Sequence, residues 1–499
     1  MLFNSIHFLI FFPVITVVYF LIPAKKRYIW LLLASYYFYM CWNAKYALLL
    51  FFSTCVTYLS GWLMEYVQRR LAAHPVRAVK YKKWCVAGCF SLNLSILFLF
   101  KYFDFVVRNI NVALEKCNLT LITPDFDVIL PVGISFYIFQ ALSYTMDVYR
   151  EEIKAEKNFL RYALFVSFFP QLVAGPIERS KNLLSQLREE HVFNFENMRA
   201  GLLIMLWGYF QKLVLADRIA IVVNQIYGHP RAYPGGYLLA ASVLFAIQIY
   251  CDFSGYSMIA IGAAKVMGFR LMENFNCPYL ARSVSGFWKR WHISLTSWFR
   301  DYLYIPLGGN RKGTLRKYIN MMIVFMVSGL WHGAAWTYIV WGLLNGLFQV
   351  AGIVTRKFRD RIYAKIGLHT ASIGHCCLRT IVTFIFIDIT WIFFRAKSVG
   401  QACYIIKSIL TVRNERIFFD GSLYTLGLNQ KQFWMMLLAI GILFVGDILK
   451  ECKVSVLEVI ISQDLWCRWL VYICSAIFIL VFGIWGAGYD AQAFVYFQF

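Results

Sequence analysis

The stretch YINMMIVFMVSGLWHGAAWTYIVWGLLNGLFQVAGI, residues 318–353, decides how this chain folds. It is almost wholly apolar. As one α-helix it would be about 54 Å long at ~1.5 Å per residue, whereas the hydrocarbon core of a bilayer is about 30 Å thick. Both flanking loops are basic, which places them on the cytoplasmic side of a membrane. We therefore predict that the stretch goes out and back, with its turn near Gly333 to Thr337.

The composition of the whole chain indicates a membrane protein. Hydrophobic residues make up 60% and charged residues 15% of the 499 residues, against roughly 45–50% and about 25% in soluble domains. Lys and Arg outnumber Asp and Glu by 49 to 26, and they occur in short clusters between apolar segments. Such clusters are typical of cytoplasmic loops, so we expect the lipid bilayer, and no nucleic acid, as the partner of these charges.

Apolar segments recur along the chain and predict roughly eleven to thirteen membrane spans. They lie near residues 5–22, 28–43, 45–65, 84–101, 128–148, 200–227, 237–264, 318–335, 338–354, 378–394, 433–449 and 468–487. The first lacks a basic leader and a cleavage site, so we expect a retained helix. We predict a single all-α integral-membrane domain over 1–499, with N-terminal helices (1–150), a catalytic core (151–354) and C-terminal helices (355–499).

Two stretches do not read as simple spans. Residues 160–178 (LRYALFVSFFPQLVAGPIE) contain Pro170 and Pro176 inside an apolar run, which favours a re-entrant segment surrounded by protein. Residues 284–305 place Trp288, Trp291, Trp298 and other apolar residues on one side of a helix. This pattern predicts one interfacial amphipathic helix on the cytoplasmic face.

His332 is the first candidate for chemistry. It lies in SGLWHGAAW, in the predicted outer half of the membrane, where glycines would leave room for a substrate. A buried imidazole with no carboxylate nearby in sequence should stay neutral and able to accept a proton. A structural histidine that makes an interhelical hydrogen bond is the alternative.

A second candidate site surrounds His292 in the tryptophan-rich block. Its basic and aromatic neighbours suit an anionic thioester donor, with cations for phosphate and rings for a stacked base. The predicted donor-binding residues are Lys289, Arg290, Trp291, Arg300 and Asn310. A structural interfacial histidine followed by a plain tight turn is equally compatible with the pattern.

Other polar residues at membrane depth are candidates for supporting roles, because each needs a partner or a function there. Asp252 either caps a broken helix or orients a catalytic group. We predict that Asp252, Tyr250, Asn345 and Ser328 support the catalytic residues without contacting the substrate themselves. Asp388 is a single acidic residue in an otherwise apolar span, and the sequence alone suggests no role for it.

Familiar motifs of several other enzyme classes are missing. The chain contains no P-loop, dinucleotide-binding, serine-hydrolase or zincin motif. Its thirteen cysteines show no repeated pairing and complete no four-ligand pattern, so we expect no metal site.

Six blocks of the sequence resemble bacterial membrane-bound O-acyltransferases of the alginate O-acetyltransferase type. The blocks are FFPQLVAGPI (168–177), YCDFSGYSMIAIG (250–262), FWKRWHISLTSWFRDYLYIPLGGNRKG (287–313), SGLWHGAAWTYIVWGLLNG (328–346), FFRA (393–396) and FVYFQF (494–499). They extend over nearly the whole chain. The family's essential membrane histidine falls on His332, and its second histidine falls on His292.

This resemblance implies a ring of tilted transmembrane helices around a central funnel, in the inner (cytoplasmic) membrane of a bacterium. An acetyl group would pass from a cytoplasmic thioester, acetyl-CoA, to a hydroxyl of a partner protein or an extracytoplasmic polysaccharide. No bound cofactor is implied. The implied partner is an SGNH-hydrolase-like acetyltransferase outside the membrane that completes the transfer to the glycan.

Two alternatives remain open at this stage. One is D-alanyl transfer to teichoic acid from an acyl carrier protein, although the sequence beyond Arg395 looks more like the acetyl group. The other is a proton-coupled transporter with His332 and Asp252 as a relay. No paired internal repeat supports transport.

Overall fold

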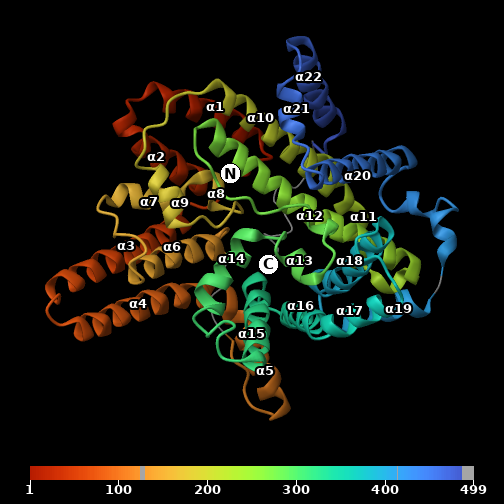
Figure 1. The fold of residues 1–499 in the computed structure, drawn as a ribbon, viewed down its shortest axis with the longest axis horizontal. Helices are drawn as coiled ribbons and strands as arrows, with labels where there is room; N and C mark the ends of the chain where they lie inside the picture. The colour runs from red at the N-terminus through yellow and green to blue at the C-terminus, as the bar shows by residue number, and fades with distance from the viewer. Residues whose placement is uncertain (124–129, 413, 486–499) are drawn as a thin grey trace. The chain divides into compact units, whose positions relative to one another are not determined.

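The computed structural model describes residues 1–123, 130–412 and 414–485, and every regular element in these ranges is a helix (Figure 1). Eight of the described helices are long and apolar enough to cross a membrane, judged by length and composition. They are Tyr46–Arg70 (α3), Pro75–Lys116 (α4 to α5), Phe195–Gly228 (α10 to α11), Gly235–Val266 (α12), Trp336–Val354 (α16), Ile373–Arg395 (α18), Gln430–Glu451 (α20) and Leu465–Phe482 (α22). The predicted all-α class is confirmed; the terminal FVYFQF block lies outside the described residues.

The predicted number of spans is not confirmed. Three of the predicted segments form shorter helices: α1 (Ile6–Leu21), α2 (Arg27–Met40) and α6 (Ile134–Tyr149) have 16, 14 and 16 residues. A straight crossing needs about 20 residues, so an apolar segment in the sequence did not always become a full-length span.

The chain divides into two compact units. Unit 1 comprises Met1–Leu202 and Ala260–Met272, and unit 2 comprises Leu203–Ile259 and Glu273–Phe499. Helices α10 (Phe195–Tyr209) and α12 contribute residues to both units. The predicted single domain, with boundaries near residues 150 and 354, stays a prediction.

Unit 1 holds the remaining N-terminal helices. Besides α1, α2, α3 and α6, they are α4 (Pro75–Leu97), α5 (Phe103–Lys116), α7 (Phe159–Ser167), α8 (Phe169–Leu172) and α9 (Ser180–Gln186). Helices α3 and α4 form a hairpin in which the Ser53 hydroxyl donates to Asn93 Oδ1 at 2.6 Å (Figure 1). Gly61 on α3 lies so close to the Tyr144 ring of α6 that an added Cβ would be 2.7 Å from the Tyr144 hydroxyl oxygen. Small and hydroxyl side chains therefore allow these helices to pack closely.

The predicted interruption of residues 160–178 is confirmed, whereas its re-entrant path stays a prediction. Helix α7 ends at Ser167, and α8 begins two residues later, just before Pro170. The backbone groups released by the break are bonded to side chains. The Phe169 amide donates to Ser35 Oγ at 3.1 Å, and Gln140 and Gln171 each donate to the Phe165 carbonyl. The polar residues in this apolar run therefore replace missing helical hydrogen bonds.

Unit 2 contains the other helices. In addition to α12, α16, α18, α20 and α22 they are α11 (Asp217–Gly228), α13 (Val284–Trp288), α14 (Ile293–Phe299), α15 (Thr314–His332), α17 (Arg356–Lys365), α19 (Val399–Thr411) and α21 (Val456–Ile461). Short helical turns connect several of them, and one of these, the π-helix Phe210–Ala216, joins α10 to α11.

Helices α15 and α16 form the predicted out-and-back hairpin. The chain turns at Gly333–Ala335, between the end of α15 and the start of α16. Two glycines face the partner helix: a Cβ on Gly329 would lie 2.2 Å from the Tyr338 carbonyl oxygen, and one on Gly342 would lie 2.2 Å from the Phe325 carbonyl oxygen. The close approach of these two backbones therefore requires glycine at both positions.

The prediction of one interfacial helix over 284–305 is wrong. The segment forms the two short helices α13 and α14 and then a π-helical turn, Arg300–Tyr304. His292, between α13 and α14, has φ +43° and ψ 54°, a left-handed backbone that no α-helix can continue through. Trp288, Trp291 and Trp298 are buried inside the unit. The aromatic side therefore faces protein.

A charged triad lies in the interior of unit 2. The Lys212 ammonium, on the π-helix, donates to Asp217 Oδ1 at 2.8 Å and to Asp252 Oδ1 at 2.7 Å. All three residues are at least nine-tenths buried. A buried carboxylate without a partner is costly, so Lys212 stabilises both acids at once and links α12 to the start of α11.

We expect Gly342→Ala to lower the stability of the protein by about 1–3 kcal/mol, because the new methyl group overlaps a backbone oxygen that cannot rotate away. Gly352→Ala, on the same helix, is the matched control, since nothing lies within 4 Å of its added Cβ. That change should be neutral or stabilising. Thermal unfolding of the purified proteins in detergent tests both, and equal midpoints would contradict the close helix approach.

Lys212→Met should destabilise the protein by about 3–5 kcal/mol, because it leaves two carboxylates buried without their cation. Lys431→Met removes the same charge at an exposed position on α20 and should have little effect. Thermal unfolding in detergent measures the difference. A Lys212→Met protein that unfolds with the Lys431→Met midpoint would show that the triad contributes nothing to stability.

Candidate active site

His332 is the last residue of α15, and aromatic rings surround it. Its ring centroid lies 4.9 Å from that of Trp331, 5.0 Å from that of Trp341 and 5.4 Å from that of Phe394. All three rings stand at steep angles to the imidazole, between 71° and 86°. Only 4% of the His332 residue is exposed. The imidazole therefore lies in a largely dry, aromatic enclosure.

His292 is held by Asn274, which lies in the extended segment before α13. Asn274 Oδ1 is 3.4 Å from His292 Nδ1 and accepts a hydrogen bond from the Ser294 hydroxyl at 2.6 Å. The Asn274 backbone carbonyl accepts from the Ile293 amide at 2.9 Å. Asn274 thus supplies partners for the first residues of α14 and stabilises the left-handed turn at His292.

The two predicted catalytic histidines lie together. Their ring centroids are 6.4 Å apart, and Trp331 contacts both imidazoles. The prediction that His292 lies on the cytoplasmic surface is therefore wrong, because the turn at His292 directs this residue into the protein. The position of His332 in the outer half of the membrane stays a prediction. Burial lowers the pKa of His292 to about 3, so its imidazole is neutral at physiological pH.

The space beside Gly333 is filled. A Cβ on Gly333 would lie 2.1 Å from the ring of Tyr338, a residue in the first turn of α16. The expectation that the missing side chain leaves room for a substrate is thus wrong for the structure as it stands. Gly333 allows Tyr338 to pack against the turn, and Tyr338 in turn contacts Phe394 at 5.1 Å.

The predicted donor-binding residues occupy different environments. Lys289 and Arg300 are exposed, and Arg300 Nε donates to Asp301 at 2.8 Å. Asn310 Oδ1 accepts from the Tyr304 hydroxyl at 2.5 Å in the loop before α15. Lys289 and Arg300 are thus exposed on the segment in which His292 is buried, and the polar turn with Asn310 follows it.

Arg290 and Trp291 have partners of their own. The Arg290 guanidinium makes two hydrogen bonds to the Glu451 carboxylate, at 2.7 and 3.0 Å. Trp291 is 0% exposed and packs against Trp391 at 5.0 Å and Phe287 at 5.3 Å. A donor could therefore meet the Arg290 charge only in competition with Glu451, and the Trp291 ring offers it no free face.

Two of the four supporting residues lie near the histidines. Asn345 Oδ1 accepts from Trp288 Nε1 at 3.3 Å, and Trp288 packs against Trp341, which borders His332. Ser328 is buried one helical turn before His332 on α15. Asn345 therefore fixes one wall of the His332 enclosure.

The other two supporting residues bond elsewhere. The Asp252 carboxylate is bound by Lys212, and the Tyr250 hydroxyl donates to both oxygens of Asp447 at 3.1 and 3.0 Å. Their neighbour Phe253 supplies the direct contact to the site instead, with its ring 4.7 Å from that of His292. Asp252 and Tyr250 thus stabilise helix packing around the site.

Asp388, which the sequence left without an account, bonds to another helix. Its Oδ2 accepts from the Ser242 hydroxyl of α12 at 2.9 Å. Trp391 and Phe394 follow at one and nearly two turns along α18, and both belong to the aromatic cluster at His332. The bond to Ser242 therefore helps to fix the helix that carries these rings.

Sequence reasoning missed several residues of the site. They are Asn274, Phe253, Trp331, Trp341, Trp391 and Phe394. One signal was available: Trp331 and Trp341 flank His332 within the quoted stretch, and tryptophans near an intramembrane histidine suit an enclosing role. Asn274 stands in an irregular segment and gives no local signal.

Comparison with known proteins identifies the family of this chain. The pattern that defines MBOAT, the membrane-bound O-acyltransferase family, matches residues 3–395. The chain is 37% identical to the probable alginate O-acetylase AlgI of Pseudomonas putida, over 81% of this chain and 79% of that protein. It is 36% identical to the peptidoglycan O-acetyltransferase of Helicobacter pylori, over 82% of this chain and 80% of that one.

A more distant relative is the teichoic acid D-alanyltransferase of Bacillus subtilis, which is 28% identical over 45% of this chain and 60% of that protein. The family match covers both histidines, the hairpin of α15 and α16, and most of α18. The chain belongs to the membrane-bound O-acyltransferase family and is a multi-pass membrane enzyme of the O-acyltransferase class.

Proposed function

We propose that this enzyme transfers an acetyl group from a cytoplasmic thioester, acetyl-CoA, across the membrane to a hydroxyl of a partner protein or an extracytoplasmic polysaccharide. The observation that carries the proposal is the meeting of His332 and His292, which lie forty residues apart in sequence, in one buried aromatic enclosure. Two neighbouring imidazoles in a dry site suit proton transfer between an alcohol and a leaving thiolate.

His332 acts as the general base in this scheme. Its imidazole takes the proton of the acceptor hydroxyl while the hydroxyl oxygen attacks the thioester carbonyl carbon. The carbon–sulfur bond then breaks, and the departing thiolate receives the proton, so the products are an O-acetyl ester and free coenzyme A. His292, neutral because of its burial, serves as a hydrogen-bond partner beside the reacting groups.

The proposal includes an architecture and a location. A ring of tilted helices around a funnel, with the broken α7–α8 segment as its re-entrant part, would give donor and acceptor separate routes to His332. The enzyme would act in the inner membrane of a bacterium. Its partner would be an SGNH-hydrolase-like acetyltransferase that passes the acetyl group to a polysaccharide. The alginate O-acetylases and the peptidoglycan O-acetyltransferase among the relatives support acetyl transfer to a glycan.

D-alanyl transfer from a carrier protein to teichoic acid is the second candidate. It rests on the similarity to the B. subtilis teichoic acid D-alanyltransferase, which covers less than half of this chain. The acetyl-transferring relatives match about four-fifths of the chain, so acetyl is the favoured group. Membership of an O-acyltransferase family leaves no support for the transporter alternative.

His332→Gln should reduce acyl transfer by about 10²- to 10⁴-fold, because the amide cannot take the proton of the acceptor. The assay supplies radiolabelled acetyl-CoA to proteoliposomes and measures label fixed on the acceptor. His229→Gln changes an exposed histidine and should leave the rate unchanged. Label transferred at the parental rate by a monodisperse His332→Gln protein would refute the catalytic role.

The same proteoliposomes separate the two candidate donors. Transfer from free acetyl-CoA supports the acetyl proposal. Transfer of radiolabelled D-alanine from a carrier protein, with no transfer from acetyl-CoA, would instead establish the second candidate and reject the first.

Replacement of Lys289, Arg290 and Arg300 by Gln in one triple variant should raise the apparent KM for the thioester more than it lowers kcat. The reason is that these three charges attract the donor's phosphates. Added salt should raise KM in the parent enzyme and have less effect in the triple variant. Because Arg290 is paired with Glu451, a Lys289/Arg300 double variant separates donor binding from loss of that ion pair. An unchanged KM at low and high salt would mean that the cluster is only a topology signal.

A further inference from the structure

A charged cavity of about 230 Å³ lies within unit 1. Its wall is formed by the end of α1, the start of α2, the start of α7 and residues 187–191, with Phe269 at one side. None of these residues belongs to the candidate active site. Four of them are cations: Lys25, Arg27, Arg161 and Arg188.

Arg27 brings a positive charge that its own hydrogen bonds do not neutralise. The guanidinium donates to the backbone carbonyls of Phe20, Ile22 and His191, all of which are neutral acceptors. It also lies over the Tyr19 ring, 5.1 Å from the centroid. These contacts fix the guanidinium in the cavity wall and leave its full charge available to an anion.

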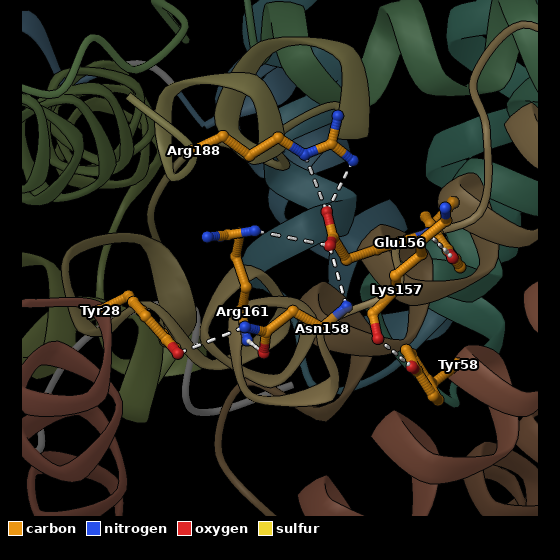
Figure 2. Close-up of polar contacts among 8 residues, drawn as sticks. Tyr28, Tyr58, Glu156, Lys157, Asn158, Arg161 and Arg188 are labelled. Atoms are coloured by element: carbon orange, nitrogen blue, oxygen red, sulfur yellow. Dashed lines mark hydrogen bonds and ion pairs between the residues drawn. The ribbon is translucent and has the colours of Figure 1, made fainter. Parts of the chain in front are cut away.

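Arg161 and Arg188 share one carboxylate. Arg188 donates to Glu156 Oε2 at 2.9 and 2.6 Å, whereas the nearest Arg161 nitrogen is 3.7 Å from Oε1 (Figure 2). Oε1 also accepts from the Asn158 amide at 3.0 Å. Two guanidiniums therefore face one buried acid, and a single positive charge is left over.

Arg161 is the less satisfied of the two. Its side chain lies over the ring of Tyr28, 5.3 Å from the centroid, and in the described part of the chain its buried Nε has no hydrogen-bond acceptor. A guanidinium that is positioned on an aromatic ring but lacks a close acceptor is suited to bind one from outside. Figure 2 shows Arg161 between Tyr28 and Glu156.

The position and size of the cavity limit what it binds. It begins where the apolar helix α1 ends, which is where phospholipid headgroups meet a membrane protein, and Tyr19 and Tyr28 in its wall are typical of that depth. Two exposed acids, Glu189 and Glu190, also line it, so the wall offers both signs of charge. Its volume is below the roughly 300–1,000 Å³ of a pocket for a large organic ligand.

We infer that this cavity binds a phosphate ester, and that its source is the headgroup of a membrane phospholipid. The phosphate is bound by Lys25, Arg27 and Arg161, and an amine-bearing headgroup such as ethanolamine places its ammonium near Glu189 or Glu190. Free phosphate shares the anionic chemistry but has no group for the two acids. The phospholipid is therefore the better match to the whole wall.

Calorimetric titration of the full-length protein in a non-phosphate detergent tests the inference. The probes are dihexanoyl phosphatidylethanolamine, sodium phosphate and dihexanoylglycerol, which lacks the phosphate. A Lys25→Gln/Arg161→Gln variant should bind the phospholipid at least about tenfold more weakly than the parent. The matched control is Lys26→Gln/Lys157→Gln, which removes two exposed charges next to the cavity residues but outside the wall, and its affinity should stay parental.

Each result is decisive. Phospholipid binding that weakens in the cavity variant, with little binding of dihexanoylglycerol, supports the headgroup site. Free phosphate that binds as tightly, with the same dependence on the variant, supports the phosphate site and makes its source soluble. The inference is overturned if the parent binds neither phosphate compound, if cavity and control variants bind alike, or if dihexanoylglycerol binds equally well. Thermal unfolding verifies the fold, and Lys25→Gln alone, at an exposed position, replaces the double variant if that does not fold.

Discussion

Backbone groups at membrane depth must be bonded inside the protein, and the structure depends on this constraint wherever a helix stops. At the break between α7 and α8, side chains of Ser35, Gln140 and Gln171 supply the missing partners. Asn274 does the same at the turn that carries His292. At both places buried amides and hydroxyls compensate for the end of a regular helix, and the candidate active site is built at the second of them.

Much of the helical framework could be predicted from local sequence. The hairpin of α15 and α16 follows from the length of one apolar stretch, because a stretch that is nearly twice the bilayer thickness has to turn. Pro170 predicted the helix break in residues 160–178. The two histidines could be singled out as candidates because a titratable group among apolar residues is costly unless it is used. Their roles remain the prediction that the proteoliposome assay tests.

The rest depends on contacts between residues far apart in the chain. Nothing near Arg290 in sequence indicates its pairing with Glu451, 161 residues away, and nothing near Asp252 indicates Lys212. The aromatic pattern of residues 284–305 fits one surface helix equally well as two buried ones. The left-handed backbone of His292 decides between them, and Asn274, which lies outside the segment, helps to stabilise it.

The aromatic rings around His332 have a consequence for side reactions. An enzyme that handles activated acyl groups has to prevent their hydrolysis, because water is itself a competent acceptor. Trp331, Trp341 and Phe394 cover the imidazole so that little solvent reaches it. In the proposed mechanism these rings shield the base from activating a water molecule. Packing around His332 would then limit hydrolysis without a dedicated group that distinguishes water from an alcohol.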